Sequence, residues 1–270
     1  DIKNCSFEDY TNAIDFTDLS ILMEGTEDGV QYSHINISSC TFKDIKHEVV
    51  RMRNNGVNSQ DHNNTQGTSE VLKWGIRRFM YSDNKHFLCS KSMSSCVHLS
   101  GGHVVANNNV FDGGATSTQD YMCLDIRGGA RSVEINGNSF VGLEGDSSNN
   151  EFTAIKFNVP HRNNTEDSTL NIQDHVTIVM NNNKIHCLNR NGAKGKNNGI
   201  LLTPYTWGYD ADERPTRVNG TFLNNDFSLH NMHYGILARQ DIDVTPALQN
   251  ATTGRTLKNA TRFRVKNNKR

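Results

Sequence analysis

The chain has no long apolar run and almost no net charge. Its longest apolar stretches are a few residues, far short of the roughly 20 that a membrane-spanning helix needs. The 28 basic and 29 acidic residues leave a net charge of −1, which argues against a protein that neutralises many nucleic-acid phosphates. We therefore expect no membrane span and no nucleic-acid partner.

The chain also lacks the cysteine spacing of a zinc site. Its six cysteines are spread over 270 residues, unlike the dense cysteines of small disulfide scaffolds, and no Cys-x-x-Cys or Cys/His cluster is present. We expect mostly buried free thiols. Asp210, Asp212 and Glu213 could bind calcium, but their spacing matches no EF-hand loop, so we predict no metal site and no cofactor.

Apolar residues are few for a globular chain. They make up 35% of the sequence, against roughly 45–50% in an average domain. A large round core is therefore not expected, whereas an elongated repeat fold needs only a few inward side chains in each repeat. Disorder is the alternative, but the apolar residues recur in strand patterns and the net charge is small.

One short pattern returns along the chain: an alternating strand, a small polar residue, one spacer, and then an aromatic or aliphatic anchor. The copies are NCSF at 4–7, SCTF at 39–42, NNVF at 108–111, GNSF at 137–140, NNKI at 182–185, NNDF at 224–227 and NNKR at 267–270, with a weaker copy, RRF, at 77–79. The copies are unevenly spaced, which suits coils whose strands are fixed and whose loops vary in length.

A second pattern consists of two apolar residues separated by one position. The pairs are Ile21/Met23, Val50/Met52, Val97/Leu99, Leu124/Ile126, Ile155/Phe157, Ile200/Leu202 and Ile236/Ala238. A period of two predicts a strand with one buried face. We therefore expect each coil to contribute at least two strands in a fixed order.

Strands that recur in the same order stack in parallel, ~4.8 Å apart. The anchors should then form one interior column: Phe7, Phe42, Phe79, Phe111, Phe140, Ile185 and Phe227. The residues two positions earlier should form a hydrogen-bonded asparagine ladder at a tight bend: Asn109, Asn138, Asn183, Asn225 and Asn268. Cys5 and Cys40 hold this position in the first coils, either as small buried residues or, in an oxidising compartment, as a disulfide.

The series V-x-I-x-N-N-x-F followed by G-I-x-L resembles the right-handed β-helix of the pectate-lyase-like superfamily, over essentially the whole chain. That superfamily includes polysaccharide lyases, polygalacturonase-like hydrolases and phage tailspike depolymerases. The resemblance, with the right-handed preference of parallel crossovers, implies an all-β, right-handed parallel β-helix of about seven coils. It also implies a polysaccharide or glycan partner, an extracellular, cell-surface or virion-surface location and, as in tailspike-like relatives, a homotrimer or larger assembly.

We expect residues 1–270 to form a single β-helix domain with incomplete coils at both ends. The copy at 4–7 has no evident preceding strand, and the copy at 267–270 lacks its anchor. Solenoid ends need caps against edge pairing. We therefore expect a segment of a longer protein, or a partner that covers the ends.

Residues between the paired apolar positions should point outward onto one sheet face. In coil order the first outward position carries Leu22, Arg51, His98, Asp125, Lys156, Leu201 and Leu237, and the second carries Glu24, Arg53, Ser100, Arg127, Asn158, Thr203 and Arg239. The middle coils thus present a polar groove, which corresponds to the substrate cleft of the superfamily that this chain resembles. Arg53 and Asn158 would bind substrate there.

Several interpretations of this face remain open. A uronic-acid lyase needs cations that neutralise the sugar carboxylate and take a proton, for which Lys156, Arg127 and Arg51 are candidates. A hydrolase needs two carboxylates, ~5–5.5 or ~6.5–9.5 Å apart, and only Asp125 is evident. His98 could be a base that Asp125 holds. In a purely structural interpretation, Asp125 and Lys156 form a solvated cross-strand pair.

Four long loops follow the strands of this face, at 54–70, 159–175, 204–219 and 240–259. The third carries Tyr205, Trp207 and Tyr209, and aromatic faces beside polar groups suit sugar rings; alternatively, Trp207 folds back over the solenoid. We expect a carbohydrate-active β-helix, a polysaccharide lyase or glycosidase resembling a tailspike depolymerase. The alternative is a non-catalytic viral fibre, capsid appendage or adhesin that uses the β-helix as a rigid or glycan-binding module, because no catalytic signature of one family is present.

Overall fold

The computed structural model describes the repeating strands and their bends. The residues described are 1–16, 34–52, 78–89, 95–99, 103–112, 121–126, 132–144, 152–159, 161–162, 175–188, 197–204, 214–215, 217–227, 234–238 and 261–269. In this part of the chain there is no helix that is long and apolar enough to cross a membrane.

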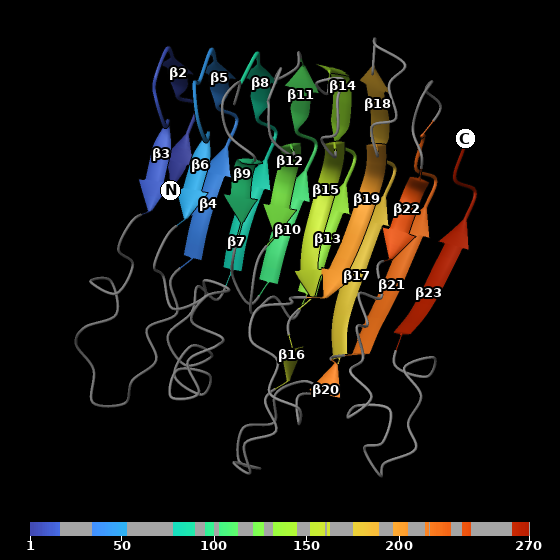
Figure 1. The fold of residues 1–270 in the computed structure, drawn as a ribbon. Coiled ribbons are helices and arrows are strands. Elements are labelled where there is room, and N and C mark those ends of the chain that lie inside the picture. Colours follow the sequence, from blue (N-terminus) through green and yellow to red (C-terminus); the bar gives the residue numbers. More distant parts are fainter. Residues whose placement is uncertain are drawn as a thin grey trace, which may run out of the picture.

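Three parallel sheets run side by side along the molecule (Figure 1). Sheet A contains β1 (Ile2–Lys3), β4 (His34–Ser38), β7 (Arg78–Ser82), β10 (His103–Asn107), β13 (Ser132–Asn136), β17 (His175–Asn181), β21 (Arg217–Leu223) and β23 (Thr261–Lys266). Sheet B contains β2 (Ser6–Glu8), β5 (Thr41–Lys43), β8 (Lys85–Phe87), β11 (Val110–Asp112), β14 (Ser139–Glu144) and β18 (Lys184–Leu188). Sheet C contains β3 (Ile14–Phe16), β6 (Val50–Met52), β9 (Ser95–Leu99), β12 (Tyr121–Ile126), β15 (Phe152–Val159), β19 (Asn197–Pro204) and β22 (Tyr234–Ala238).

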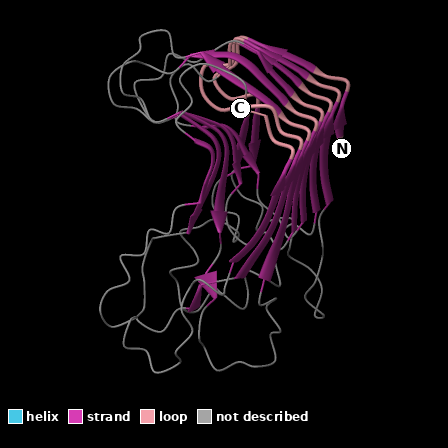
Figure 2. Cartoon of the chain, turned by 90° about the vertical axis from the view of Figure 1, so that its right-hand side faces the viewer, coloured by secondary structure: helices cyan, strands magenta, loops and turns pink. Residues whose placement is uncertain are grey.

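The first six coils visit sheets A, B and C in that order, and their strands pair with their counterparts in neighbouring coils; between β21 and β22 an isolated bridge at Asp226 stands in place of a sheet B strand. Figure 2 shows the strands and bends of successive coils superposed when the molecule is turned by 90°. The expected parallel β-helix of about seven coils is therefore confirmed. Its winding direction stays a prediction from the right-handed preference of parallel crossovers.

The bend between sheets A and B has the same conformation in every coil. Its first residue has a positive φ, as in Ser39 (56°), Asn108 (56°) and Gly137 (68°). Asparagine, aspartate and glycine adopt this left-handed conformation at the lowest cost. The Asn-Asn dipeptides in the repeat thus supply two functions, because the first Asn makes the bend and the second enters the ladder.

The asparagine ladder is continuous and longer by one member than the sequence predicts, because Asn84 belongs to it. The side-chain amide of each Asn donates to the Oδ1 of the Asn in the next coil, at 3.1 Å from Asn84 to Asn109 and 2.9 Å from Asn109 to Asn138. The ladder continues through Asn183, Asn225 and Asn268 at 2.9–3.0 Å. Each amide also donates to a backbone carbonyl, as Asn138 does to Ala106 at 2.8 Å, so these buried polar groups are satisfied.

The ring column forms, but its third member is His86 and not Phe79. Rings of adjacent coils stack with centroids 5.2 Å apart for Phe7 and Phe42, 5.3 Å for Phe42 and His86, and 4.1 Å for His86 and Phe111. Phe140 extends the stack, 4.9 Å beyond Phe111. The prediction that RRF at 77–79 is the weak copy is therefore wrong.

The true copy in the third coil is DNKH at 83–86, where Asp83 has a positive φ of 59°. Phe79 lies on β7 in sheet A, opposite Ile35 and Val104. It is still fully buried, because both sheets turn one face toward the same interior.

Two further corrections concern the first coil. The residues that pair with Val50–Met52 are Ile14–Phe16, whereas Ile21 and Met23, like Leu22 and Glu24, lie outside the described residues. The first bend does have strand residues before it, because Ile2 and Lys3 pair with Ile37 and Ser38.

The later inward pairs are confirmed by register. Leu124 lies between Val97 and Ile155, and Ile155 lies beside Ile200. The three pairs Val97/Leu99, Leu124/Ile126 and Ile155/Phe157 are buried, and all belong to one apolar cluster with the ring column. The interior is thus a thin apolar rod, as the low apolar content implies.

Two neighbouring loops after sheet C meet. β16 (His161–Arg162) and β20 (Arg214–Pro215) form a short antiparallel pair, and they lie in the long loops at 159–175 and 204–219. Most other residues of the four long loops lie outside the described part of the chain.

Candidate functional site

The row predicted for sheet C is in register, with one correction at its start, but His98, Asp125 and Leu201 in this row are buried. Asp15, and not Leu22, is the partner of Arg51, and the pairing of Val50 with Val97 places Arg51 beside His98. The row then continues in register through Asp125, Lys156, Leu201 and Leu237. Side chains far apart in sequence are therefore neighbours on one sheet.

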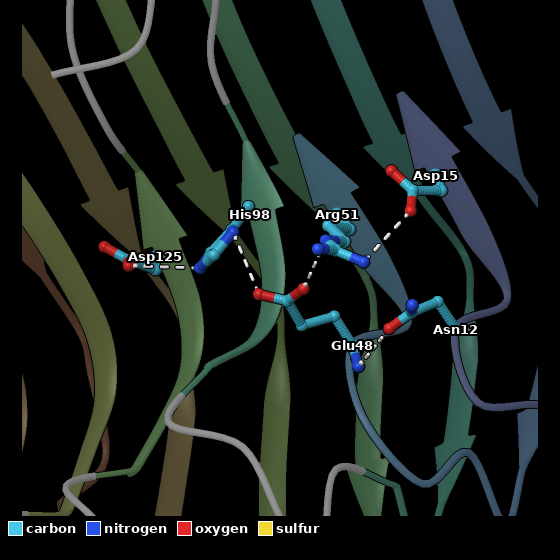
Figure 3. A network of polar contacts seen from close by, with 6 residues as sticks. All are labelled: Asn12, Asp15, Glu48, Arg51, His98 and Asp125. Carbon is cyan, nitrogen blue, oxygen red and sulfur yellow. Dashed lines mark hydrogen bonds and ion pairs between the residues drawn. The ribbon is translucent and has the colours of Figure 1, made fainter. Parts of the chain in front are cut away.

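An ion-pair network joins the first part of this row (Figure 3). Arg51 Nη1 lies 3.3 Å from Asp15 Oδ2, and Arg51 Nε lies 3.5 Å from Glu48 Oε2. The other oxygen of Glu48, Oε1, lies 3.3 Å from His98 Nδ1. His98 Nε2 lies 3.5 Å from Asp125 Oδ2. Four adjacent coils thus contribute alternating charges to one chain of contacts.

Glu48 is the member that sequence reasoning missed. It lies in the turn between β5 and β6, where its backbone N–H donates to Asn12 Oδ1 at 3.2 Å. Both Val49 and Val50 after it are buried, so the alternation of the strand breaks here and does not indicate which way Glu48 points. The only available signal was an acidic residue directly before the predicted strand.

His98 is held between two carboxylates. Each ring nitrogen of His98 lies within 3.5 Å of one carboxylate oxygen. The side chains of Glu48 and Asp125 are 5% and 0% exposed. Buried charges are tolerated when they are paired, and this alternation of acid and base supplies the pairs.

The charged side chains of this row that solvent reaches lie toward its two ends. The side chains of Asp15 and Arg51 are 31% and 20% exposed, and Lys156 is partly exposed. Asp125 and Lys156 are direct cross-strand partners, as the structural interpretation expects, but the Asp125 side chain is fully buried and therefore not solvated. Asp125 lies within ion-pair distance of His98 on the opposite side.

The structure brings four of the predicted catalytic residues into one row: Arg51, His98, Asp125 and Lys156. Their chemical roles stay predictions. Asn158 lies on β15 opposite Thr203, but its side chain lies outside what the structure describes. The remaining predicted site residues also lie outside the described ranges: Arg53, Arg127, Tyr205, Trp207 and Tyr209.

No metal centre is found among the residues that the structure describes, since no three His, Cys, Asp or Glu side chains there converge as ligands. The acidic residues at 210, 212 and 213 are not among them. Comparison of the chain with protein-family models, with curated proteins and with solved structures gives no match.

Proposed function

We propose that this protein is a carbohydrate-active β-helix that binds an acidic polysaccharide along sheet C and cleaves it as a lyase. The observation that carries the proposal is the charged row from Asp15 to Lys156, in register on five adjacent strands. The proposal includes membership of the pectate-lyase-like superfamily, an extracellular, cell-surface or virion-surface location, and a homotrimer or larger assembly, as the resemblance to that superfamily implies.

An extended acidic chain fits the spacing of the two accessible cations. Arg51 and Lys156 lie three strand spacings apart, or ~14 Å. Each would meet a different carboxylate of a polymer that runs parallel to the coil axis. A small ligand would not reach both, so the row favours a polymeric substrate.

Burial favours a lyase over a glycoside hydrolase. A hydrolase places two carboxyl groups against the glycosidic bond, and Glu48 now supplies a second carboxylate besides Asp125. Both are almost fully buried and both bind His98, so neither meets a substrate in this arrangement. A lyase needs an accessible cation and a base instead.

We assign the proton transfer to Lys156. Its amine would take the proton from the carbon beside the sugar carboxylate. The electron pair of that C–H bond forms the double bond of the unsaturated uronate, and the glycosidic oxygen leaves from the next carbon and takes a proton from water. Arg51 would bind a second carboxylate of the polymer. Glu48, His98 and Asp125 act as positioning residues, because Glu48 pairs with Arg51 and in turn contacts His98, which contacts Asp125, and all three side chains are buried.

The test is an incubation with a panel of acidic polysaccharides while absorbance of unsaturated uronates and new reducing ends are measured together. We expect both signals to rise together. Lys156→Ala should abolish them, whereas Lys85→Ala, an exposed lysine on β8 of sheet B, should leave them unchanged. New reducing ends without unsaturated product would show hydrolysis and refute the lyase assignment.

A non-catalytic glycan-binding rod is the second candidate. The observation that favours it is the same burial, because a paired and buried Glu48–His98–Asp125 cluster is also what a stiff structural module would contain. This candidate would be established if intact oligosaccharide binds, if Arg51→Ala weakens that binding, and if neither unsaturated uronates nor new reducing ends appear.

A further inference from the structure

The asparagine ladder ends in two cysteines. Cys5 and Cys40 follow positive-φ residues Asn4 and Ser39, so they occupy the ladder position in the first two coils. The backbone N–H of Cys40 donates to Asn84 Oδ1 at 2.9 Å, which is the bond that each Asn of the ladder makes to the next. The thiols therefore continue the ladder without its amides.

The geometry of the ladder brings the two thiols together. Thr41 N donates to Cys5 O at 2.8 Å, which fixes the two bends one strand spacing apart. Cys40 Sγ lies 3.7 Å from Ile2 O, as Asn84 Nδ2 lies 3.0 Å from Ile37 O in the next coil. Ladder side chains of adjacent coils touch, and both thiols lie against neighbouring carbonyl oxygens of β1, Cys5 Sγ at 3.3 Å from Lys3 O and Cys40 Sγ at 3.7 Å from Ile2 O.

From this placement of the two thiols we propose that Cys5 and Cys40 form a disulfide that links the first coil to the second. The disulfide would form by exchange with a low-molecular-weight disulfide such as glutathione disulfide. Neighbouring parallel strands are ~4.8 Å apart, within the Cα separation of about 4.4–6.8 Å that disulfides span. The Asn side chains of the other coils show that this bend directs both Cβ atoms the same way.

The reaction takes two exchange steps. The thiolate of Cys5, which is partly exposed, attacks one sulfur of glutathione disulfide, and one glutathione thiolate leaves. The thiolate of Cys40 then attacks Cys5 Sγ and releases the second glutathione thiolate. The two protein thiols are oxidised, one glutathione disulfide is reduced to two thiols, and the two protein protons end on these thiols.

Cys5 reacts first because its side chain is more exposed to solvent than that of Cys40. Cys40 is buried, and burial raises the pKa of its thiol, so it is the slow resolving group. The mixed disulfide on Cys5 should therefore accumulate at lower pH, and closure should accelerate roughly tenfold for each pH unit below the pKa of Cys40.

Other cysteine pairs are less suited to this exchange. Cys96 and Cys123 lie on adjacent strands β9 and β12, but both are almost fully buried, so an external disulfide does not reach them in the folded chain. Cys89 is buried as well, and its Sγ contacts the carbonyl oxygens of Phe42 and Phe87. Among the five cysteines whose side chains the structure describes, reactivity in the folded chain should thus be confined to the first bend.

In the experiment, the folded chain is treated with glutathione disulfide, and its disulfide-linked peptides are mapped by mass spectrometry. A second sample is treated with a reductant after the glutathione disulfide and mapped in the same way. We expect one Cys5–Cys40 cross-link, and amide exchange in β1 and β2 that slows by roughly a hundredfold because the ring of residues 5–40 is closed. Reduction should reverse both changes. The Cys5→Ser variant should show neither.

The Cys123→Ser variant is the matched control, because it removes a buried thiol from sheet C and should leave the cross-link intact. A stable glutathione adduct on Cys5 with Cys40 still free at pH 9 would overturn the proposal. So would a cross-link that joins any other cysteines, or an unchanged thiol content after prolonged exposure. None of these outcomes depends on polysaccharide cleavage.

Discussion

His86 makes the interior of the β-helix sensitive to acid. Its ring is fully buried in the column between Phe42 and Phe111. Nδ1 lies 2.8 Å from Val110 O, so it carries the proton and donates. Nε2 then accepts from the Tyr81 hydroxyl at 2.6 Å, and burial raises the pKa of Tyr81 well above its usual range. The neutral imidazole is therefore the form that fits.

Burial lowers the pKa of His86 from 6.5 to about 4, and the hydrogen bond to Val110 offsets only part of this effect. The unfolded chain then binds more protons than the folded chain between these two values, so protonation favours unfolding. The contribution of neutral His86 is fully present above about pH 6.5 and is lost as the pH falls toward 4. The free energy of unfolding should fall by about 1.4 kcal/mol at pH 5.5 and about 3 kcal/mol at pH 4 from this residue alone.

The assay is urea unfolding at several pH values, with the wild-type chain compared with the double variant Tyr81→Phe/His86→Phe. This variant restores an apolar ring to the column and removes the phenol that would otherwise lose its partner. Apart from Tyr81, whose pKa lies well above these pH values, the two chains share every other titratable group, so the difference between the two profiles isolates His86. If the two profiles run parallel from pH 7.5 to pH 4, the neutral buried imidazole is refuted.

Three further substitutions test the packing and the network by urea unfolding near neutral pH. Asn138→Ala should lower the free energy of unfolding by roughly 2–4 kcal/mol, because it leaves the Asn109 amide and the backbone N–H of that residue without their acceptor; a loss below about 0.5 kcal/mol would show that the ladder is dispensable. Gly199→Ala should lower the free energy of unfolding by about 1–3 kcal/mol, because the added Cβ would lie 2.6 Å from Gly235 O and 2.7 Å from the Phe227 ring. An unchanged free energy of unfolding would mean that the Phe227 ring does not lie against Gly199. Glu48→Gln should cost about 3 kcal/mol, because it removes the carboxylate charge that faces both Arg51 and His98; a neutral effect would show that the buried network is not ionic.

The repeat made most of the fold predictable, because a bend and an anchor recur in every coil. The positions of Asn109, Asn138 and Phe140 followed from that unit alone. His86 did not, because the search required an apolar anchor, while an imidazole with two hydrogen-bond partners fits the same place. The shared feature that identifies the third coil is the bend, in which Asp83 and Asn84 replace the Asn-Asn dipeptide.

The sequence predicted the members of the sheet C row that lie on strands in which inward and outward residues alternate. His98, Asp125 and Lys156 stand between buried residues in the sequence, and parallel pairing makes them neighbours. Glu48 was not predicted because the two residues after it, Val49 and Val50, are both buried. A period of two therefore does not indicate which way the Glu48 side chain points. The first coil was misplaced because Ile14–Phe16 and 21–23 both show apolar alternation, and only the pairing with β6 separates them.

A crystal structure with a bound acidic oligosaccharide would show whether the polymer lies along sheet C, as we propose. We expect one sugar carboxylate within hydrogen-bonding distance of Lys156 Nζ and another near Arg51, with the polymer running across β6, β9, β12 and β15. An oligosaccharide bound against sheet A or sheet B, with Lys156 and Arg51 untouched, would contradict this proposal.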